Sequence, residues 1–289
     1  MAARIWTAAA GRANRTLLRF GDVSMRERRL NRAYHSIFAA NEGKPFSPGD
    51  AARSPTGKSY VVAFGHRSGS TLLRSLLTAT GSMGVPAEYL NPRDAMPRWV
   101  GTSGAHTMSE YFDYLLREKS TPNGVFGMKS IYPHFEALDI ADLIEHFMGP
   151  VTYVYLERED ILRQAVSLAL AHATGVWYNR EQEPGQAKRD ADLPYDDPLV
   201  MTSLDRLRRD RVSWDEFFKR RGIDPLRLTY EQLVAEPEET VLAVARHVGV
   251  EVPEQQVTAK SEYAPLADSI NERWLAQLRE RHPELAPTA

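Results

Sequence analysis

Short apolar runs alternate along this chain with segments whose apolar residues recur at helical spacing. Four runs have the length and composition of buried strands: 60–64, 125–129, 151–156 and 225–230. Helices are predicted between and after them, over 72–77, 134–147, 160–173, 199–221 and 238–248. Strands joined by helices favour a mostly parallel sheet with helices on both faces. The pattern therefore predicts an α/β fold of three layers, α/β/α.

A loop rich in glycine and serine follows the first run. Its sequence is Gly65-His66-Arg67-Ser68-Gly69-Ser70-Thr71, and it opens the helix predicted over 72–77. Such a loop gathers free backbone N–H groups and the positive end of the helix dipole in one place. It predicts an anion site, most often one for phosphate or its analogues.

This loop differs from the Walker A motif of nucleotide-dependent phosphoryl transferases. Gly65 and Gly69 are one residue too close together, and Ser70 follows where that motif has lysine. Arg67 is the local cation. An anion cradle without the lysine favours a transferred group that does not depend on magnesium. From the loop alone, a turn that binds no ligand remains the alternative.

Further anion ligands are predicted at the carboxyl ends of the other strands, where open α/β sheets bind their ligands. Lys129 ends the second run, although a solvated surface lysine is the simpler interpretation of it. Arg158 follows the third run, and Ser167 lies about two and a half turns into the next helix. Arg and Ser are good phosphate ligands. Two separate anion sites fit a nucleotide that is phosphorylated at both ends.

These segments resemble the sulfotransferases that use phosphoadenosine phosphosulfate (PAPS), and most closely the bacterial trehalose sulfotransferase-like family. The resemblance covers about residues 59–249. It is carried by the order and spacing of HRSGSTLL, GVPAEY, TPNGVFGMKS, YLEREDILRQAVS and LTYEQL. It implies a P-loop-related fold and transfer of a sulfuryl group from PAPS to an acceptor hydroxyl, with no metal.

The resemblance also implies which residues bind PAPS as co-substrate. In such enzymes the first loop holds the phosphosulfate, while an arginine after a strand and a serine on the next helix hold the 3′-phosphate. Lys129 is included as a strand-end cation facing the same ligand. The implied set is Arg67, Ser68, Gly69, Ser70, Thr71, Lys129, Arg158 and Ser167.

Glu88 of the GVPAEY element is the general base that the resemblance implies. This element is predicted to be a short extended piece, and burial can raise the pKa of a carboxyl group toward working pH. His66, beside Arg67, is the alternative base. Trehalose-type sequences tend to have a carboxylate where this chain has Val85. The expected acceptor is therefore a carbohydrate or glycolipid hydroxyl, and the case for trehalose itself is weaker.

The first 57 residues differ in composition from the rest. Between residues 4 and 32, eight arginines face only Asp22 and Glu27, with apolar residues interleaved. Three interpretations remain: a basic segment on an anionic membrane surface, a targeting peptide, or an extension that packs on the body. We divide the chain into an N-terminal extension and linker, 1–57, and a sulfotransferase-like domain, 58–289.

Composition excludes several classes of function and of site. The net charge of −2 argues against a nucleic-acid-binding surface, and the lack of cysteine excludes disulfides and thiolate chemistry. The eight histidines show no metal-binding spacing, and no apolar run approaches the ~20 residues of a membrane span. We expect a cytoplasmic enzyme, membrane-associated if its basic N-terminus binds lipid, and leave a homodimer open.

Two other functions remain open from the residues themselves. A P-loop kinase or NTPase would carry a loop lysine and an acidic Mg²⁺ ligand after a strand, whereas the third run ends in Glu157. A non-catalytic nucleotide-binding member of the fold is the other alternative. In the C-terminal part, Lys260, Asn271 and Arg273 are weaker candidates for closing over PAPS.

Overall fold

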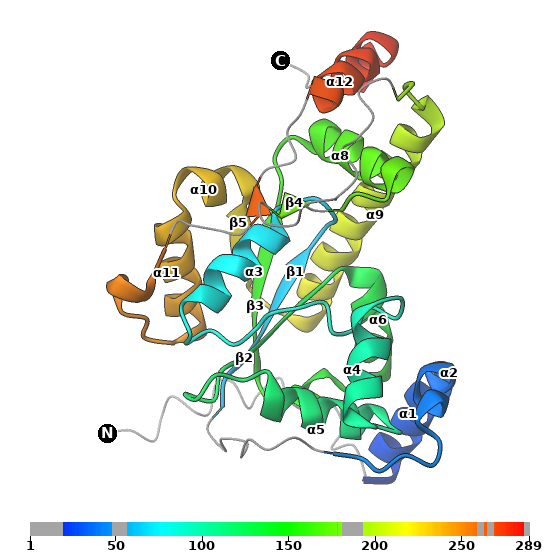
Figure 1. Cartoon of the computed structure of the whole chain (residues 1–289), viewed down its shortest axis with the longest axis vertical. Coiled ribbons are helices and arrows are strands. Elements are labelled where there is room, and N and C mark those ends of the chain that lie inside the picture. Colours follow the sequence, from blue (N-terminus) through cyan, green and yellow to red (C-terminus); the bar gives the residue numbers. More distant parts are fainter. Residues whose placement is uncertain are drawn as a thin grey trace.

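A four-stranded parallel sheet lies at the centre of the molecule (Figure 1). The computed structural model describes residues 20–47, 57–177, 179–180, 193–258, 263–264 and 269–285. The strands lie in the order β2-β1-β3-β5, with bounds β2 (Phe126–Ser130), β1 (Ser59–Phe64), β3 (Val151–Glu157) and β5 (Leu226–Thr229). The predicted parallel α/β sheet is confirmed, and each predicted strand lies within a residue or two of an observed one.

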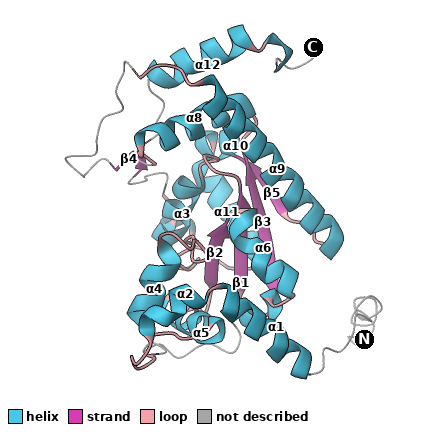
Figure 2. Cartoon of the chain, turned by 90° about the vertical axis from the view of Figure 1, so that its right-hand side faces the viewer, coloured by secondary structure: helices cyan, strands magenta, loops and turns pink. Residues whose placement is uncertain are grey.

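Helices cover both faces of this sheet (Figure 2). Alternate residues of β1 point to opposite faces, as the two-residue period of a strand requires. Tyr60, Val62 and Phe64 pack into one cluster, with α3 (Ser70–Ala79) and α11 (Pro237–Val248). Val61 and Ala63 pack into the other. That second cluster also takes side chains from α4 (Ala95–Ser103), α5 (Met108–Glu118), α6 (Tyr132–Ala141), α7 (Ile144–Met148) and α9 (Asp197–Arg221).

The long helix α9 joins the sheet to a third, all-helical cluster. Its C-terminal half places Trp214 and Phe217 against the sheet, while Leu204 packs with α8 (Ile161–Thr174) and α12 (Ser269–Arg281). The other elements are α10 (Tyr230–Ala235), between β5 and α11, and an antiparallel pair, β4 (Asn179–Arg180) with β6 (Tyr263–Ala264). Because α9 spans both clusters, it reaches the carboxyl edge of the sheet from the side.

The helix predicted over 134–147 is wrong as a single element. The chain forms α6 and α7 instead, separated at Asp142, whose φ of 55° lies in the left-handed region. Asp142 is held there by Arg221 and Arg26. Asp tolerates this conformation better than most residues, so it can end a helix within an apolar pattern.

The N-terminal residues that the structure describes pack on the body. Leu30 of α1 (Phe20–Ala33) and Phe38 of α2 (His35–Phe38) are buried in the cluster beside α5 and α6. The amide of Asn41, fully buried, donates to the carbonyls of Val100 and Ala105 at 2.7 and 3.0 Å. Residues 1–19 and 48–56, which carry much of the predicted basic segment and linker, lie outside the described residues. No described helix has the length and apolar character needed to cross a membrane.

Candidate active site

The loop between β1 and α3 makes a tight turn at the carboxyl edge of the sheet. Two of its residues adopt left-handed backbone conformations, Arg67 with φ 65° and Gly69 with φ 85°. Gly69 caps α3, and a Cβ placed on it would lie 2.5 Å from the ring of Tyr230. Only glycine fits this position without displacing a neighbour. The turn presents the first N–H groups of α3, and so the positive end of its dipole, at the sheet edge.

Buried polar atoms beside this turn have no hydrogen-bond partner among the residues that the structure describes. The Ser68 hydroxyl is one, in a residue that is fully buried, and the Nε of Arg158 is another. The Arg158 guanidinium lies 4.5 Å from the centre of the Tyr230 ring, and its Nη1 donates to the Arg67 carbonyl at 3.4 Å. Unpaired buried donors are costly to a fold. Their presence around an anion-binding turn fits a ligand that bears phosphate or sulfate oxygens.

Arg67 connects the two anion sites predicted from the sequence. Its Nε donates to the Ser167 hydroxyl at 3.0 Å, and its guanidinium also donates to the Trp177 carbonyl. Its own carbonyl accepts from Arg158. Both members of the predicted Arg158/Ser167 pair are therefore brought to Arg67, on the side where β3 leads into α8.

Lys129 is a buried cation and not the solvated surface lysine that the sequence alone favours. It is 5% exposed at the end of β2. Its Nζ donates to the hydroxyls of Ser70 at 3.1 Å and Thr71 at 3.4 Å, and forms an ion pair with Glu88 Oε1 at 3.1 Å. A positive charge thus lies at the N-terminus of α3, supplied from a neighbouring strand because the loop itself has no lysine.

Glu88 reaches this point because its segment runs beside β2. Ala87 forms a parallel bridge with Met128, and the Lys129 N–H donates to the Ala87 carbonyl at 3.0 Å. Gly84 permits the close approach, since a Cβ there would lie 2.9 Å from backbone atoms of Val125 and Gly127. The segment lies in the extended form that GVPAEY predicts, and it delivers a carboxylate to the donor loop.

The pKa of Glu88 is lowered, against the expectation that burial would raise it. Burial does act in that direction, but the charge and hydrogen bond of Lys129 oppose it, with smaller contributions from His66 and His134. The net direction is downward. Glu88 is therefore a carboxylate at neutral pH, ready to accept a proton.

His66 is held neutral, with its basic nitrogen engaged. Burial and the nearby Arg206 lower the pKa of His66 to about 3. Nη2 of Arg206 lies 3.1 Å from His66 Nε2. Because a guanidinium can only donate, this Nε2 accepts, and the ring proton is on Nδ1. The geometry favours Glu88 over His66 as the base.

The structure brings the predicted site residues to one edge of the sheet. They come from the β1–α3 loop, the ends of β2 and β3, helix α8 and the segment beside β2: His66, Arg67, Ser68, Gly69, Ser70, Thr71, Lys129, Arg158, Ser167 and Glu88. Among the described residues, no group of three or more histidine or acidic side chains is arranged to hold a metal ion.

Two residues of this region are missing from the sequence prediction. Arg206 lies in α9, within a stretch whose charges look like an ordinary solvated helix face, so only the fold could place it. His134 is the third residue of α6, four residues beyond the end of β2, and its position after a strand end was a usable signal. Of the weaker candidates, Arg273 donates to the Leu193 carbonyl at 2.7 Å, and Lys260 lies outside the described residues.

Comparison with known proteins identifies a family. The model of the Stf0 sulphotransferase family matches residues 59–281. Trehalose 2-sulfotransferase from Mycobacterium tuberculosis is 27% identical, over 78% of this chain and 96% of the relative. The enzyme of the same name from Mycolicibacterium smegmatis is 26% identical, over 76% and 94%. Among solved structures, the sulfotransferase domain from the curacin biosynthetic pathway aligns with a TM-score of 0.45 at 14% identity, over 78% of this chain and 98% of that domain.

The family match covers the whole sheet, the anion-binding loop and the helices around them. The loop and the buried donors beside it offer hydrogen bonds to an anionic sulfuryl donor, and the nearby carboxylate offers a proton acceptor. The chain belongs to the Stf0 sulphotransferase family and is a PAPS-dependent sulfotransferase.

Proposed function

We propose that this enzyme sulfates a hydroxyl of a carbohydrate or glycolipid, with Glu88 as the general base. The observation that carries the proposal is the Glu88–Lys129 pair at the N-terminus of α3, which puts an ionised carboxylate next to the donor loop. The names of the trehalose 2-sulfotransferase relatives support a sugar as acceptor. The resemblance to trehalose-type sequences implies a carboxylate where this chain has Val85, which leaves the particular sugar to be found.

The donor side is assigned to the loop and to the residues around it. Bound PAPS supplies an activated sulfuryl group, whose transfer to an oxygen leaves a phosphate behind. In this proposal the N–H groups of Ser68, Gly69 and Ser70, with Arg67, bind the phosphosulfate, and Arg158 with Ser167 binds the 3′-phosphate; the contacts of Arg67 with Ser167 and Arg158 support it. Preorganised donors of this kind stabilise charge that develops on the leaving group.

On the acceptor side, Glu88 takes the hydroxyl proton. Lys129 binds its Oε1, which leaves Oε2 to accept the proton as the acceptor oxygen attacks. Lys129 also contacts Ser70 and Thr71, so the same cation orients the base and faces the donor. Lys129 would thereby hold the proposed base and the donor loop in a fixed relative position.

The proposal is tested by sulfate transfer from labelled PAPS to a panel of mono- and disaccharides and glycolipids. We expect labelled sugar with wild-type enzyme and at least about a hundredfold less with Glu88→Gln. Calorimetry with 3′-phosphoadenosine 5′-phosphate (PAP) checks the donor site separately. Its binding should be metal-independent and lost in Arg158→Ala. Retained PAP binding with transfer to non-sugar hydroxyls alone would reject the carbohydrate acceptor.

A glycolipid acceptor fits the basic N-terminal sequence. We infer that the enzyme is cytoplasmic and contacts the membrane through this sequence. Residues 1–19 carry four arginines and no acidic residue. Because α1 and α2 are built into the body, the informative truncation removes 1–19 and leaves Leu30 and Phe38 in place. Binding to vesicles containing anionic lipid should weaken in the truncated protein; unchanged binding would count against membrane contact.

A further inference from the structure

Arg206 extends from α9 toward the acceptor side of the site, and no carboxylate of the described chain forms an ion pair with it. Its guanidinium contacts a neutral ring, with His66 Nε2 at 3.1 Å. Asp210, one turn along α9, is close enough to sense Arg206 but forms no ion pair with it. A half-buried guanidinium usually has an acidic partner. Here the partner is missing from the described protein.

The surroundings of Arg206 carry an excess of positive charge. Lys129 neutralises Glu88, the acid that faces this region. The guanidiniums of Arg206 and Arg93 are both near enough to His134 to lower its pKa, although burial is the larger cause. Burial and the nearby Arg206 lower the pKa of His66, His134 and His172, so these three rings are neutral and add no charge. Among the described residues neither Arg206 nor Arg93 forms an ion pair, and Asp210, the acid near Arg206, offsets only one of these two charges.

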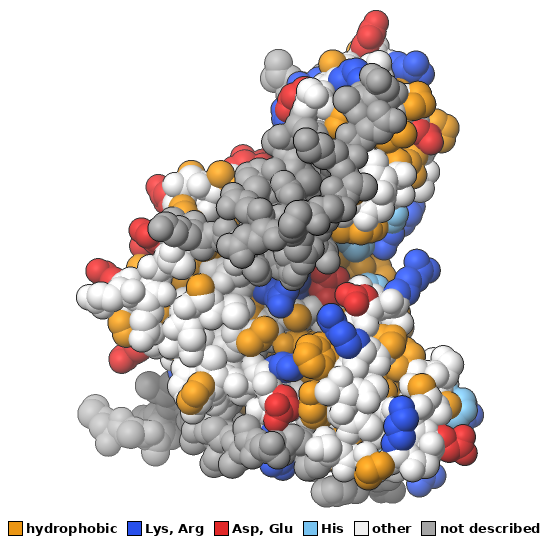
Figure 3. Space-filling model, in the orientation of Figure 1, with side chains coloured by type: hydrophobic (Ala, Val, Ile, Leu, Met, Phe, Trp, Pro, Cys, Tyr) orange, Lys and Arg blue, Asp and Glu red, His pale blue; other side chains and the backbone are white. Residues whose placement is uncertain are grey.

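The same region has a surface suited to a sugar ring and an unused polar atom. The rings of His66 and His172 lie 6.0 and 5.0 Å from the exposed indole of Trp177, which offers an apolar face. The Nδ1 of His134 is buried and has no hydrogen-bond partner within the described part of the chain. Figure 3 shows a hollow at the right of the molecule, between the α8–α9 region and the part near α6, where histidine and basic side chains gather.

We propose that the acceptor carries an acidic substituent, a phosphate or a carboxylate on the sugar, and that Arg206 binds it. The Arg206 guanidinium, which has no acidic partner among the described residues, supplies the charge-assisted hydrogen bonds, Trp177 the ring contact, and Arg93 a second positive charge. Arg206 is then a residue that determines acceptor specificity. This inference rests on the proposed carbohydrate acceptor and narrows it to acidic sugars.

The test uses three probes with the same ring: glucose, glucose 6-phosphate and glucuronate. Each is titrated by calorimetry into protein saturated with PAP, so that the donor site is filled. We expect the phosphate or the carboxylate arm, or both, to bind at least about tenfold more tightly than glucose. Arg206→Gln should abolish that preference while PAP affinity stays the same. Arg206→Lys, which keeps the charge, should retain part of it.

Arg208→Gln is the matched control, because Arg208 lies on the same helix with half of its side chain exposed and pairs with Asp205. It should keep the preference. Equal affinity for all three probes in the wild-type protein would overturn the inference. So would a preference that survives Arg206→Gln, or inorganic phosphate bound as tightly as glucose 6-phosphate in both proteins, since binding of the anion would then depend neither on the sugar nor on Arg206. Failure of PAP itself to bind would instead refute the donor assignment.

Discussion

At the scale of single residues, two pairs of side chains decide which group can take a proton. Lys129 lowers the pKa of Glu88 against the effect of burial, and Arg206 occupies the basic nitrogen of His66. The resemblance implies Glu88 as the base, with His66 as the alternative, because both are bases near the loop. Their partners separate them: one is ionised with a free oxygen, and the other is neutral with its lone pair used.

Glu88→Gln removes the base and keeps the shape of the side chain. We expect kcat to fall by about 10²–10⁴-fold, the usual contribution of general acid–base catalysis. PAP affinity should change little, because Glu88 contacts the donor loop only through Lys129. Glu136→Gln, on an exposed position of α6, is the control. An activity within a few-fold of wild type would exclude Glu88 as the base.

Lys129→Met should move the pH profile as well as the rate. In the wild-type enzyme the lowered pKa of Glu88 places the acidic limb of kcat/KM below the ordinary carboxyl value of 4.5. Without Lys129, the main opposition to burial is removed and this pKa rises, so protonation begins at higher pH and the limb shifts upward. A profile measured from pH 4 to 9 shows the difference. A limb that stays in place would mean that another group controls it.

Lys129 and Arg206 also show where prediction from sequence stops at this scale. The loop, Arg158 and Ser167 follow from motifs and strand ends, which are local signals. Whether Lys129 is solvated depends on the segment around Glu88, some forty residues earlier in the chain, lying beside β2. Arg206 belongs to a helix whose charges look ordinary until α9 crosses the sheet edge.

At the scale of elements, the β1–α3 turn is the feature that makes the proposed donor site. Its left-handed Gly69 lies against Tyr230, which in turn lies under Arg158. A change at one glycine is therefore transmitted to both proposed phosphate sites. The helix begins where it does because this glycine caps it.

Gly69→Ala should weaken PAP binding by at least about tenfold. The new methyl would lie 2.5 Å from the Tyr230 ring and force the loop or that ring to shift. Gly81→Ala is a matched control: its φ of 65° is also left-handed, but no atom lies within 4 Å of the added Cβ. Each variant should lose about 1–2 kcal/mol of stability from backbone strain. Calorimetry that found equal PAP affinity in both variants would contradict this role for Gly69.

The strands and most helices were predictable because their signals are local. An apolar run needs no partner to mark a buried strand, and the period of α8 or α11 marks a helix. The break between α6 and α7 was not predictable from the sequence, since Asp142 interrupts an amphipathic pattern that continues on both sides. Its left-handed backbone is held by arginines that lie far away in sequence.

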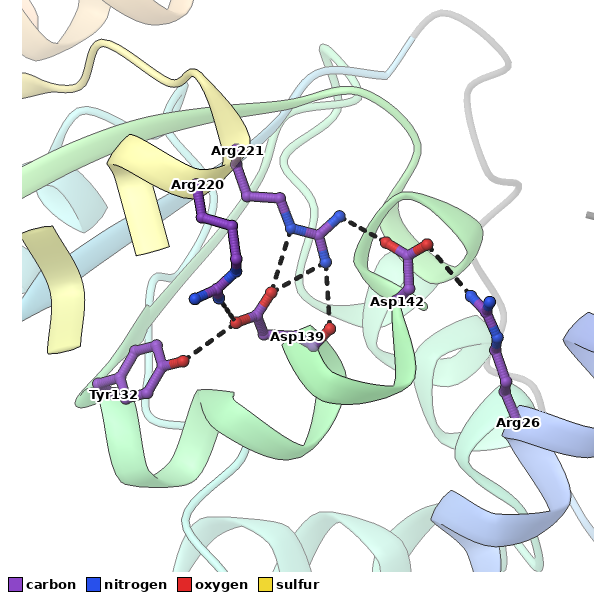
Figure 4. Close-up of polar contacts among 6 residues, drawn as sticks. All are labelled: Arg26, Tyr132, Asp139, Asp142, Arg220 and Arg221. Atoms are coloured by element: carbon purple, nitrogen blue, oxygen red, sulfur yellow. Dashed lines mark hydrogen bonds and ion pairs between the residues drawn. The ribbon is translucent and has the colours of Figure 1, made fainter. Parts of the chain in front are cut away.

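At the scale of the whole molecule, those arginines form a network that joins three parts of the chain (Figure 4). Asp139, 3% exposed near the end of α6, pairs with Arg220 and Arg221 at the end of α9. Asp142 pairs with Arg221 and with Arg26 of α1. The network fixes α6 against α9. These two helices carry His134 and Arg206, so it also sets the spacing of the proposed acceptor side.

Asp139→Ala should therefore destabilise the protein and loosen the acceptor side together. Removing one partner of a buried charge cluster costs about 3–5 kcal/mol, and the partial exposure of Arg220 and Arg221 favours the lower end. Arg26→Ala breaks an exposed pair of the same network and should cost less than about 1 kcal/mol. Urea unfolding separates the two values.

The functional part of this prediction is a raised KM for the acceptor with PAP affinity unchanged, because β1, α3 and Arg158 lie outside the network. Equal unfolding costs for Asp139→Ala and Arg26→Ala would show that burial of Asp139 carries no special weight. An equal loss of PAP and acceptor affinity would show a general loosening of the fold. Only a selective effect on the acceptor supports the view that an ion network at one end of α6 and α9 positions the chemistry at the other.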